Sequence, residues 1–255
     1  MGRNVLITGA SSGIGAATAR LLVDRGDVVG ICARRADRLA EVPAAHRWTV
    51  DLADLDAIEP FAARAARDMG GVDVLINNAG APRRRSMTRI TVDEFDETMR
   101  VNFASAVRLT LALLPGMLEK GSGLVVNVSS MGSRSVAMNV GAYAAAKAAL
   151  NHFTEALHFD LAGTGVRAQL FIPGSTSSEF STDKPGNDPP FPQDPRHVMA
   201  PDDVARALVE FLDRDEFEGF ASDAHRRQSV MKYTDHNAFL AAAKRRLADA
   251  RRGAS

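Results

Sequence analysis

Short runs of β-branched and other apolar residues alternate with alanine-rich helical segments along most of the chain. This alternation is typical of parallel strands joined by right-handed helical crossovers, because parallel neighbours need a long connection between them. We therefore expect an α/β fold with one doubly wound parallel sheet and helices on both of its faces. The predicted strands are residues 5–8, 28–32, 48–50, 74–77, 124–128 and 166–172, and the predicted helices include 14–25, 58–69, 95–120, 142–162 and 201–212.

No stretch of linker composition divides the chain before about residue 175, so we predict a single domain over residues 1–255. Six of the eleven prolines fall between Pro185 and Pro201, which predicts an irregular loop over about residues 175–200. Residues 218–227 hold no clear apolar run for a seventh strand. A helical tail is expected over about 235–253, with Asp235 as its N-cap and Gly253 as its C-cap.

Composition excludes several classes of partner. The 31 Lys and Arg residues balance 31 Asp and Glu residues, so no net field favours nucleic acid or an anionic membrane. The single cysteine, Cys32, excludes an intrachain disulfide and fits a reducing cytoplasm. The N-terminus leads directly into a predicted strand, which leaves no room for a signal peptide. Because Arg108, Pro115 and Glu119 interrupt the most apolar helical stretch, we expect no bilayer span and a cytoplasmic protein.

Residues 8–15, TGASSGIG, join the first predicted strand to the first predicted helix. Glycines at such a junction allow a tight turn and close backbone approach to a pyrophosphate, which the helix N-terminus then faces. A glycine-rich turn alone is often only a turn, but the strand–turn–helix context favours phosphate binding. The spacing Gly-x-x-x-Gly-x-Gly differs from the usual dinucleotide fingerprint.

Tyr143 and Lys147 lie four positions apart in a predicted helix, where their side chains are neighbours. A cation beside a phenol favours the phenolate, so we expect Lys147 to lower the pKa of Tyr143 toward the working range of an acid/base catalyst. Ser130 follows the apolar run 124–128, at a strand end where parallel sheets hold their ligands. Such a Tyr/Lys pair alone is more often an exposed surface pair, and the nucleotide-binding sequence upstream favours catalysis.

These motifs together resemble the short-chain dehydrogenase/reductase family over roughly residues 3–212. Besides the variant glycine spacing, the motif 77–80 (NNAG) follows the fourth strand and Pro173-Gly174 follows the sixth. The resemblance implies a Rossmann fold and an oxidoreductase that interconverts a small carbonyl compound and a secondary alcohol with a nicotinamide cofactor. Its catalytic tetrad is matched in order and spacing by Asn102, Ser130, Tyr143 and Lys147.

The resemblance also implies roles for these residues. Tyr143 would exchange a proton with the reacting oxygen, Lys147 would keep the phenol acidic and hold the nicotinamide ribose, and Ser130 would bind that oxygen. Asn102 would hold a water that links Lys147 to solvent, although an Asn in a helix is more often a packing or kink feature. The expected cofactor contacts are Gly9, Ser11, Ser12, Gly13, Ile14, Gly15, Arg34, Arg35, Asp51, Leu52, Asn78, Ala79, Gly80, Tyr143, Lys147, Pro173, Gly174 and Ser178.

The end of the second predicted strand indicates which nucleotide is bound. An NAD site places an acid about 20 residues past the glycines, whereas an NADP site offers arginine there. Here Arg34 and Arg35 end the strand, and no carboxylate precedes Asp37. Planar guanidinium donors match a phosphate, so NADP is predicted and NAD is less favoured, unless both arginines only solvate a helix start. By resemblance, Asp51 lies at the adenine edge and Ser178 at the nicotinamide carboxamide.

Several residues near the expected cleft carry open alternatives. The run 83–85 (RRR) either attracts an anionic substrate or, more commonly, forms a solvated loop. Phe180 and Phe191 indicate either an apolar substrate or simple anchoring of their loop. No cluster of His, Cys and carboxylates has ligand spacing, so no metal is expected.

A second class of function remains open, a nucleotide-binding regulator on the same fold without turnover. The complete set of Ser130, Tyr143 and Lys147 favours the enzyme, because a pure binder needs no acid, activator and oxyanion donor together.

The helical segments 103–120 and 142–162 carry apolar residues on more than one face, whereas a helix that only covers a sheet needs one stripe. We therefore expect burial against another subunit. By resemblance these helices pair across a two-fold axis, which predicts a homodimer, with a homotetramer as the weaker alternative. The residues concerned are Val107, Leu111, Leu114 and Leu118 in one segment and Ala146, Leu150, Phe153 and Leu157 in the other.

Overall fold

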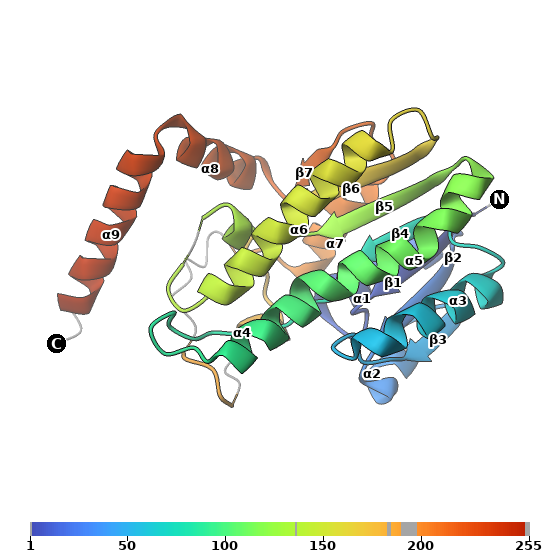
Figure 1. Cartoon of the computed structure of the whole chain (residues 1–255), viewed down its shortest axis with the longest axis horizontal. Helices are drawn as coiled ribbons and strands as arrows, with labels where there is room; N and C mark the ends of the chain where they lie inside the picture. The colour runs from blue at the N-terminus through green and yellow to red at the C-terminus, as the bar shows by residue number, and fades with distance from the viewer. Residues whose placement is uncertain (1, 136, 183–184, 190–197, 253–255) are drawn as a thin grey trace.

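The computed structural model describes residues 2–135, 137–182, 185–189 and 198–252 (Figure 1). Within them lies one parallel seven-stranded sheet of order β3-β2-β1-β4-β5-β6-β7, which confirms the predicted α/β class. The chain order reverses between β1 and β4, which is where doubly wound sheets bind their ligands. The strands are β1 Asn4–Thr8, β2 Val28–Ala33, β3 His46–Thr49, β4 Val74–Asn77, β5 Gly123–Val128, β6 Val166–Ile172 and β7 Glu218–Phe220.

Helices cover both faces of the sheet, as Figure 1 shows. One core contains Val5 and Ile7 of β1 and is covered by α1 and α7, whereas Leu6 faces the other core, under α3, α5 and α6. Both faces of β1 are therefore buried, which explains its continuous apolar sequence. The helices up to β7 are α1 Gly13–Asp24, α2 Ala36–Ala40, α3 Ile58–Met69, α4 Val92–Met99, α5 Ser105–Lys120, α6 Gly141–Asp160 and α7 Pro201–Phe211.

The predicted helix 95–120 is longer and less regular than its sequence suggested. It begins at Val92, where Thr91 and Glu94 form a reciprocal capping box, and a five-residue π turn, Arg100–Ala104, separates α4 from α5. Among the described residues, the combined helix Val92–Lys120 is the one segment whose length and composition would allow a membrane crossing. Leu109 and Leu113 on this helix are buried in the sheet core, which is the environment of a core helix.

The C-terminal part corrects two expectations. Residues 218–227 contain a seventh strand after all, because Glu218–Phe220 pairs with the last residues of β6. A second helix, α8 Asp223–Thr234, follows it and was not predicted. The expected tail helix is α9 His236–Arg252, and Asp235 accepts a hydrogen bond from the amide of Ala238 at 2.9 Å as an N-cap. In Figure 1, α9 extends away from the layered body.

The predicted loop 175–200 is irregular in its described parts. They hold a single bridge between Thr176 and Met199 and a short 3₁₀ turn, Glu179–Ser181. Phe191 in this loop, like Gly253 at the end of the tail, lies outside the described residues.

The apolar faces expected for subunit contacts are only partly free. Ala146, Leu150 and Leu157 of α6 are buried inside the subunit, so these three side chains are not available to another subunit. Leu111 and Leu118 of α5 are 54% and 41% exposed and remain available to another subunit.

Candidate functional site

A cavity of about 650 Å³ opens at the carboxyl ends of the central strands, in the volume range of ligand pockets. Its walls come mainly from the segments that follow β1 to β6 and from α6. Every residue predicted to contact a cofactor lines it except Gly15, which lies in the first turn of α1. Ser130, Tyr143 and Lys147 line it too, whereas Asn102 does not.

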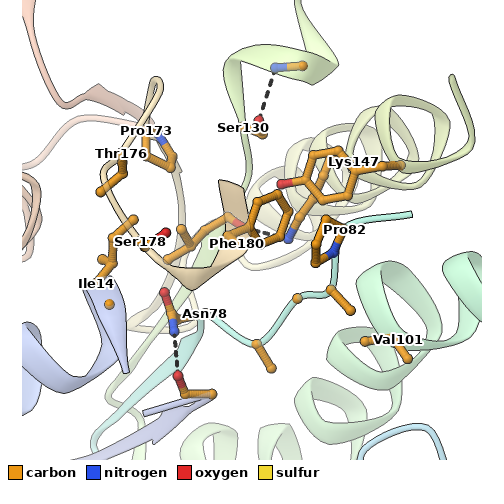
Figure 2. A pocket seen from close by; sticks show the side chains of 18 of the residues that line it. Ile14, Asn78, Pro82, Val101, Ser130, Lys147, Pro173, Thr176, Ser178 and Phe180 are labelled. Carbon is orange, nitrogen blue, oxygen red and sulfur yellow. Dashed lines mark hydrogen bonds between the residues drawn. The ribbon is translucent and has the colours of Figure 1, made fainter. Parts of the chain in front are cut away.

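The glycine-rich turn is fixed by contacts between neighbouring strand ends. Gly9 has φ of 69°, and a Cβ there would lie 2.7 Å from Cα of Ala79, so this close approach requires glycine. Asn78 lies in the cavity wall (Figure 2), where its Nδ2 donates to the carbonyl of Thr8 at 2.9 Å, and the amides of Asn78 and Ala79 donate to Thr8 Oγ1. The N-terminus of α1 follows, with Ser12 in extended conformation and no side-chain cap on its first amides. This arrangement suits a phosphate.

The arginines predicted for the nucleotide phosphate lie at the same end of the cavity. Arg35 Nη2 donates to Ser11 Oγ at 3.1 Å and to Ser12 Oγ at 3.0 Å. Within the described part of the chain, Arg34 has no ion-pair partner. No carboxylate precedes Asp37 at the end of β2, but the fold supplies one, because Arg35 Nη1 donates to Glu179 Oε2 at 2.7 Å.

The predicted catalytic side chains meet where β5 ends against α6. Lys147 is 3% exposed, and its Nζ donates to the carbonyl of Val128 at 2.8 Å. Ser130 caps the short turn that follows β5, and its Oγ accepts from the amide of Gly132 at 3.0 Å (Figure 2). Tyr143 enters the cavity from the first turn of α6. An acid/base group, a cation and a hydroxyl therefore share one wall.

The net shift in the pKa of Tyr143 is opposite to the expected lowering, because burial dominates it. Burial raises the pKa of Tyr143 to about 12, and a hydrogen bond with Ser130 acts in the opposite direction but less strongly. Burial also lowers the pKa of Lys147 to about 8. Desolvation penalises the charged form of each side chain, so at neutral pH the phenol keeps its proton and most of the lysine stays charged.

Asn102 does not line the cavity but supports a segment of its wall. Its side chain is buried in the π turn, where Oδ1 accepts from the amide of Ala81 at 3.0 Å and Nδ2 donates to the carbonyls of Ala81 and Thr98. A Cβ on Gly80 would lie 3.0 Å from Asn102 Oδ1 and 3.8 Å from Lys147 Nζ. Asn102 therefore holds the strand-end segment that passes Lys147, and it lies in the π turn that interrupts its helix.

Neither interpretation of the arginine run 83–85 is correct. Arg84 is 3% exposed and donates to backbone carbonyls of the loop after β6. Arg83 pairs with Glu97 at 2.6 Å, and Arg85 donates to Glu94 at 3.0 Å. These guanidinium groups hold protein segments together, so they form neither a solvated loop nor an open anion site.

Sequence reasoning missed two residues that α8 brings into the cavity wall, His225 and Gln228. His225 packs so closely that a Cβ on Gly174 would lie 2.0 Å from its Cε1 and Nε2. The available signal was Ser222, whose Oγ accepts from the amide of His225 as a helix N-cap. In the described part of the chain, no three His, Cys, Asp or Glu side chains are placed to hold a metal ion.

The curated relatives include proteins of which this chain matches only part. An uncharacterised oxidoreductase of Mycobacterium tuberculosis is 41% identical over 179 residues, 65% of this chain and 52% of that protein. The chain thus spans about half the length of this relative.

Solved structures match over a larger share of the chain. A short-chain dehydrogenase from Streptomyces avermitilis has 29% identity and a TM-score of 0.79 and covers 100% of this chain and 98% of its own. One from Sphingobium yanoikuyae in complex with NADPH has 27% identity and a TM-score of 0.77, over 92% of this chain and 94% of its own.

The family profile described as short chain dehydrogenase matches residues 3–188, which include the glycine-rich turn, Asn102, Ser130, Tyr143 and Lys147. With most of its length inside that profile, the chain belongs to the short chain dehydrogenase family.

Proposed function

We propose that this chain is an NADP(H)-dependent oxidoreductase that interconverts a carbonyl compound and a secondary alcohol, with Tyr143 as its acid/base. The observation that carries the proposal is that one cavity joins two kinds of site. One end holds the uncapped N-terminus of α1 with Arg34 and Arg35, and the other holds Tyr143 with Lys147. A phosphate-bearing nucleotide and a polar reacting group fit that pair of ends.

The residues present fit NADP. The amides at the start of α1 and the hydroxyls of Ser11 and Ser12 would hold the pyrophosphate, and Arg34 and Arg35 would hold the additional phosphate. Asp51 and Leu52 would border the adenine, with Pro173, Gly174 and Ser178 around the nicotinamide. The similar Sphingobium yanoikuyae protein binds NADPH, which supports the same choice here. When bound, the nicotinamide supplies or accepts the hydride.

Side chains of the protein would carry out the proton transfer. Because burial holds the pKa of Tyr143 near 12, the phenol is protonated at neutral pH and can donate to a carbonyl oxygen. Ser130 would donate a hydrogen bond to the same oxygen as its charge grows. Lys147, still mostly charged, would stabilise the phenolate that remains.

The proposal is tested by following NADPH absorbance with a panel of ketones, aldehydes and quinones. Wild-type protein should oxidise NADPH with at least one of them, and Tyr143→Phe should bind NADPH without turnover. A wild-type protein that binds NADPH tightly and reduces none would instead be a nucleotide-binding regulator on the same fold.

We also propose a homodimer in which α5 and α6 meet their counterparts. Support comes from the exposed apolar side chains of Leu111, Leu118 and Phe159, the last 70% exposed, because such residues favour burial at an interface.

A further inference from the structure

The side chain of Phe180 is part of the wall beside the proposed proton donor. Phe180 lies in the 3₁₀ turn Glu179–Ser181, and its ring centroid is 5.3 Å from that of Tyr143, with 59° between the ring planes. Figure 2 shows the Phe180 ring directed into the cavity toward Lys147. A small molecule whose oxygen reaches Tyr143 would therefore contact the Phe180 ring.

Arg84 fixes the backbone that carries this ring. Its guanidinium is buried, and it donates to the carbonyl of Phe180 at 3.3 Å, of Thr182 at 2.7 Å and of Asp188 at 3.0 Å. Three carbonyls in one loop thus share one planar donor group, a geometry that a lysine cannot reproduce. The segment after β4 and the segment after β6 are tied together through this side chain.

Asp188 provides a second tie between the same segments. Its amide donates to the carbonyl of Arg84 at 2.6 Å, and its carboxylate accepts from the amide of Ser86 at 3.0 Å and from Arg89 at 2.8 Å. The amide of Arg84 donates to Asn187 Oδ1 at 3.0 Å. The loop is therefore anchored to the segment after β4 at Phe180 and Thr182 and again at Asn187 and Asp188.

The arginines near this wall form ion pairs with carboxylates of the protein. Arg83 and Arg85 are paired with Glu94 and Glu97, and Arg85 also lies 3.6 Å from Asp188. The cavity lining also includes the apolar side chains of Pro82, Val101, Met131 and Val140. A ligand at Tyr143 would meet an aromatic ring and aliphatic groups, and it would find arginines that are already neutralised.

We infer that Phe180 is a specificity-determining residue that selects uncharged, apolar carbonyl substrates, and that Arg84 is the positioning residue that holds it against Tyr143. This inference rests on the proposed function and deepens it by naming a substrate class. The contact favours aryl or branched alkyl ketones, which bury apolar surface on the ring, over keto acids, whose carboxylate would lose hydration against that ring.

The test compares kcat/KM for three probes: acetophenone as the apolar ketone, acetone as a small ketone, and pyruvate as an anionic one. Phe180→Ala should lower kcat/KM for acetophenone about tenfold or more and change that for acetone less than threefold, as expected for loss of one buried aromatic contact. Binding of NADPH, followed by its fluorescence, should stay within about twofold. An equal loss for all three probes would overturn the inference.

The positioning role is tested with Arg84→Lys, which keeps the charge but loses the planar fork. It should reproduce the loss of preference for acetophenone with NADPH affinity retained. Arg83→Met is the matched control, because Arg83 has carboxylate partners but no contact to the Phe180 loop carbonyls among the described residues, and it should leave the preference unchanged. If Arg84→Lys retains the preference, Arg84 does not position Phe180.

Failure of the proposed function is read separately by calorimetric binding of acetophenone to the NADPH-loaded protein. If Phe180→Ala binds acetophenone more weakly than wild type does, and wild type turns over no probe, the result contradicts the proposed reaction and supports the specificity role. If wild type turns over the probes and Phe180→Ala changes neither kcat/KM nor acetophenone binding, the result contradicts the specificity role alone.

Discussion

Arg35 and Glu179 are 144 positions apart in the sequence, yet Nη1 of Arg35 donates to Oε2 of Glu179 across 2.7 Å. The pair joins the nucleotide end of the cavity to the turn that carries Phe180. Because the two side chains are 43% and 44% exposed, the bond contributes at most about 1 kcal/mol and can be exchanged for another partner. A phosphate on Arg35 would therefore compete with the Glu179 carboxylate.

Removing that carboxylate should favour the phosphorylated nucleotide. We predict that Glu179→Gln tightens NADPH binding about two- to fivefold, as expected for loss of a weak surface competitor, and changes NADH binding less than twofold. Glu41→Gln is the control, because Glu41 pairs with Arg38 at 4.0 Å and does not line the cavity. Equal tightening for NADPH and NADH, measured by fluorescence titration, would contradict the competition.

Replacing Arg34 and Arg35 together by Met should weaken NADPH binding by roughly 2–4 kcal/mol through lost charge-assisted bonds and leave NADH binding little changed. Dissociation constants for both nucleotides provide the measurement. Wild-type protein that binds NADPH and NADH equally well would refute the preference.

Tyr143→Phe preserves the ring and its contact with Phe180 but removes the proposed proton donor. Turnover should fall by roughly 10²–10⁴ or more, while NADPH affinity stays nearly constant. Steady-state kinetics and nucleotide titration on the same preparation separate the two effects. Full activity of the purified variant would exclude Tyr143 as the acid.

The buried lysine predicts how stability depends on pH. The pKa of Lys147 is about 8 in the fold, below its value of about 10.4 in an unfolded chain, so the unfolded state binds more protons between these values. The free energy of unfolding should therefore rise with pH across that window. Across this window the free energy of unfolding of wild type should rise by on the order of 2–3 kcal/mol more than that of Lys147→Met, which lacks the amino group.

Urea unfolding of both proteins at pH 7.5 and pH 10 checks this difference. The raised pKa of Tyr143 destabilises the fold only above about pH 10, and it does so in both proteins, so the comparison isolates Lys147. If the difference in free energy of unfolding between wild type and variant does not change with pH, the lysine titrates as it does in water.

The proposed dimer is tested at α5. Leu111→Glu places a charge on an exposed apolar position and should shift the protein from dimer to monomer in light scattering at micromolar concentration. Val92→Glu is a suitable control, because Val92 is 75% exposed but lies at the start of α4. Wild-type protein that is monomeric at this concentration would reject the dimer.

Much of the fold was predictable because its signals are local. The strand ends, the turn 8–15 and the Tyr143/Lys147 pair each follow from residues a few positions apart, and the cavity brings most of the predicted site residues together. The strand β7 was missed because its three residues become a strand only by pairing with β6. Gly219 lacks the side chain of an apolar run because Phe211 occupies the space where its Cβ would lie.

The site contacts that the sequence did not reveal join residues far apart in the chain. Glu179 reaches Arg35, Arg84 reaches the Phe180 loop, and His225 packs on Gly174, and no local pattern encodes these pairs. The pKa of Tyr143 was misjudged for a related reason. Helical spacing shows that Lys147 is near, but only the fold shows that both side chains are buried.

The π turn at residues 100–104 has a consequence for how this region can vary in length. A π turn contains one residue more than an α turn, so each residue before it is displaced by about 100° around the helix axis relative to an uninterrupted α-helix. Deleting one residue here would restore the regular helical phase and turn α4 by about 100° relative to α5. The two helices could then not both keep their packing, and the anchor that Asn102 provides for the segment at Ala81 would be displaced. In this helix, the number of residues is as strict a requirement as their identity.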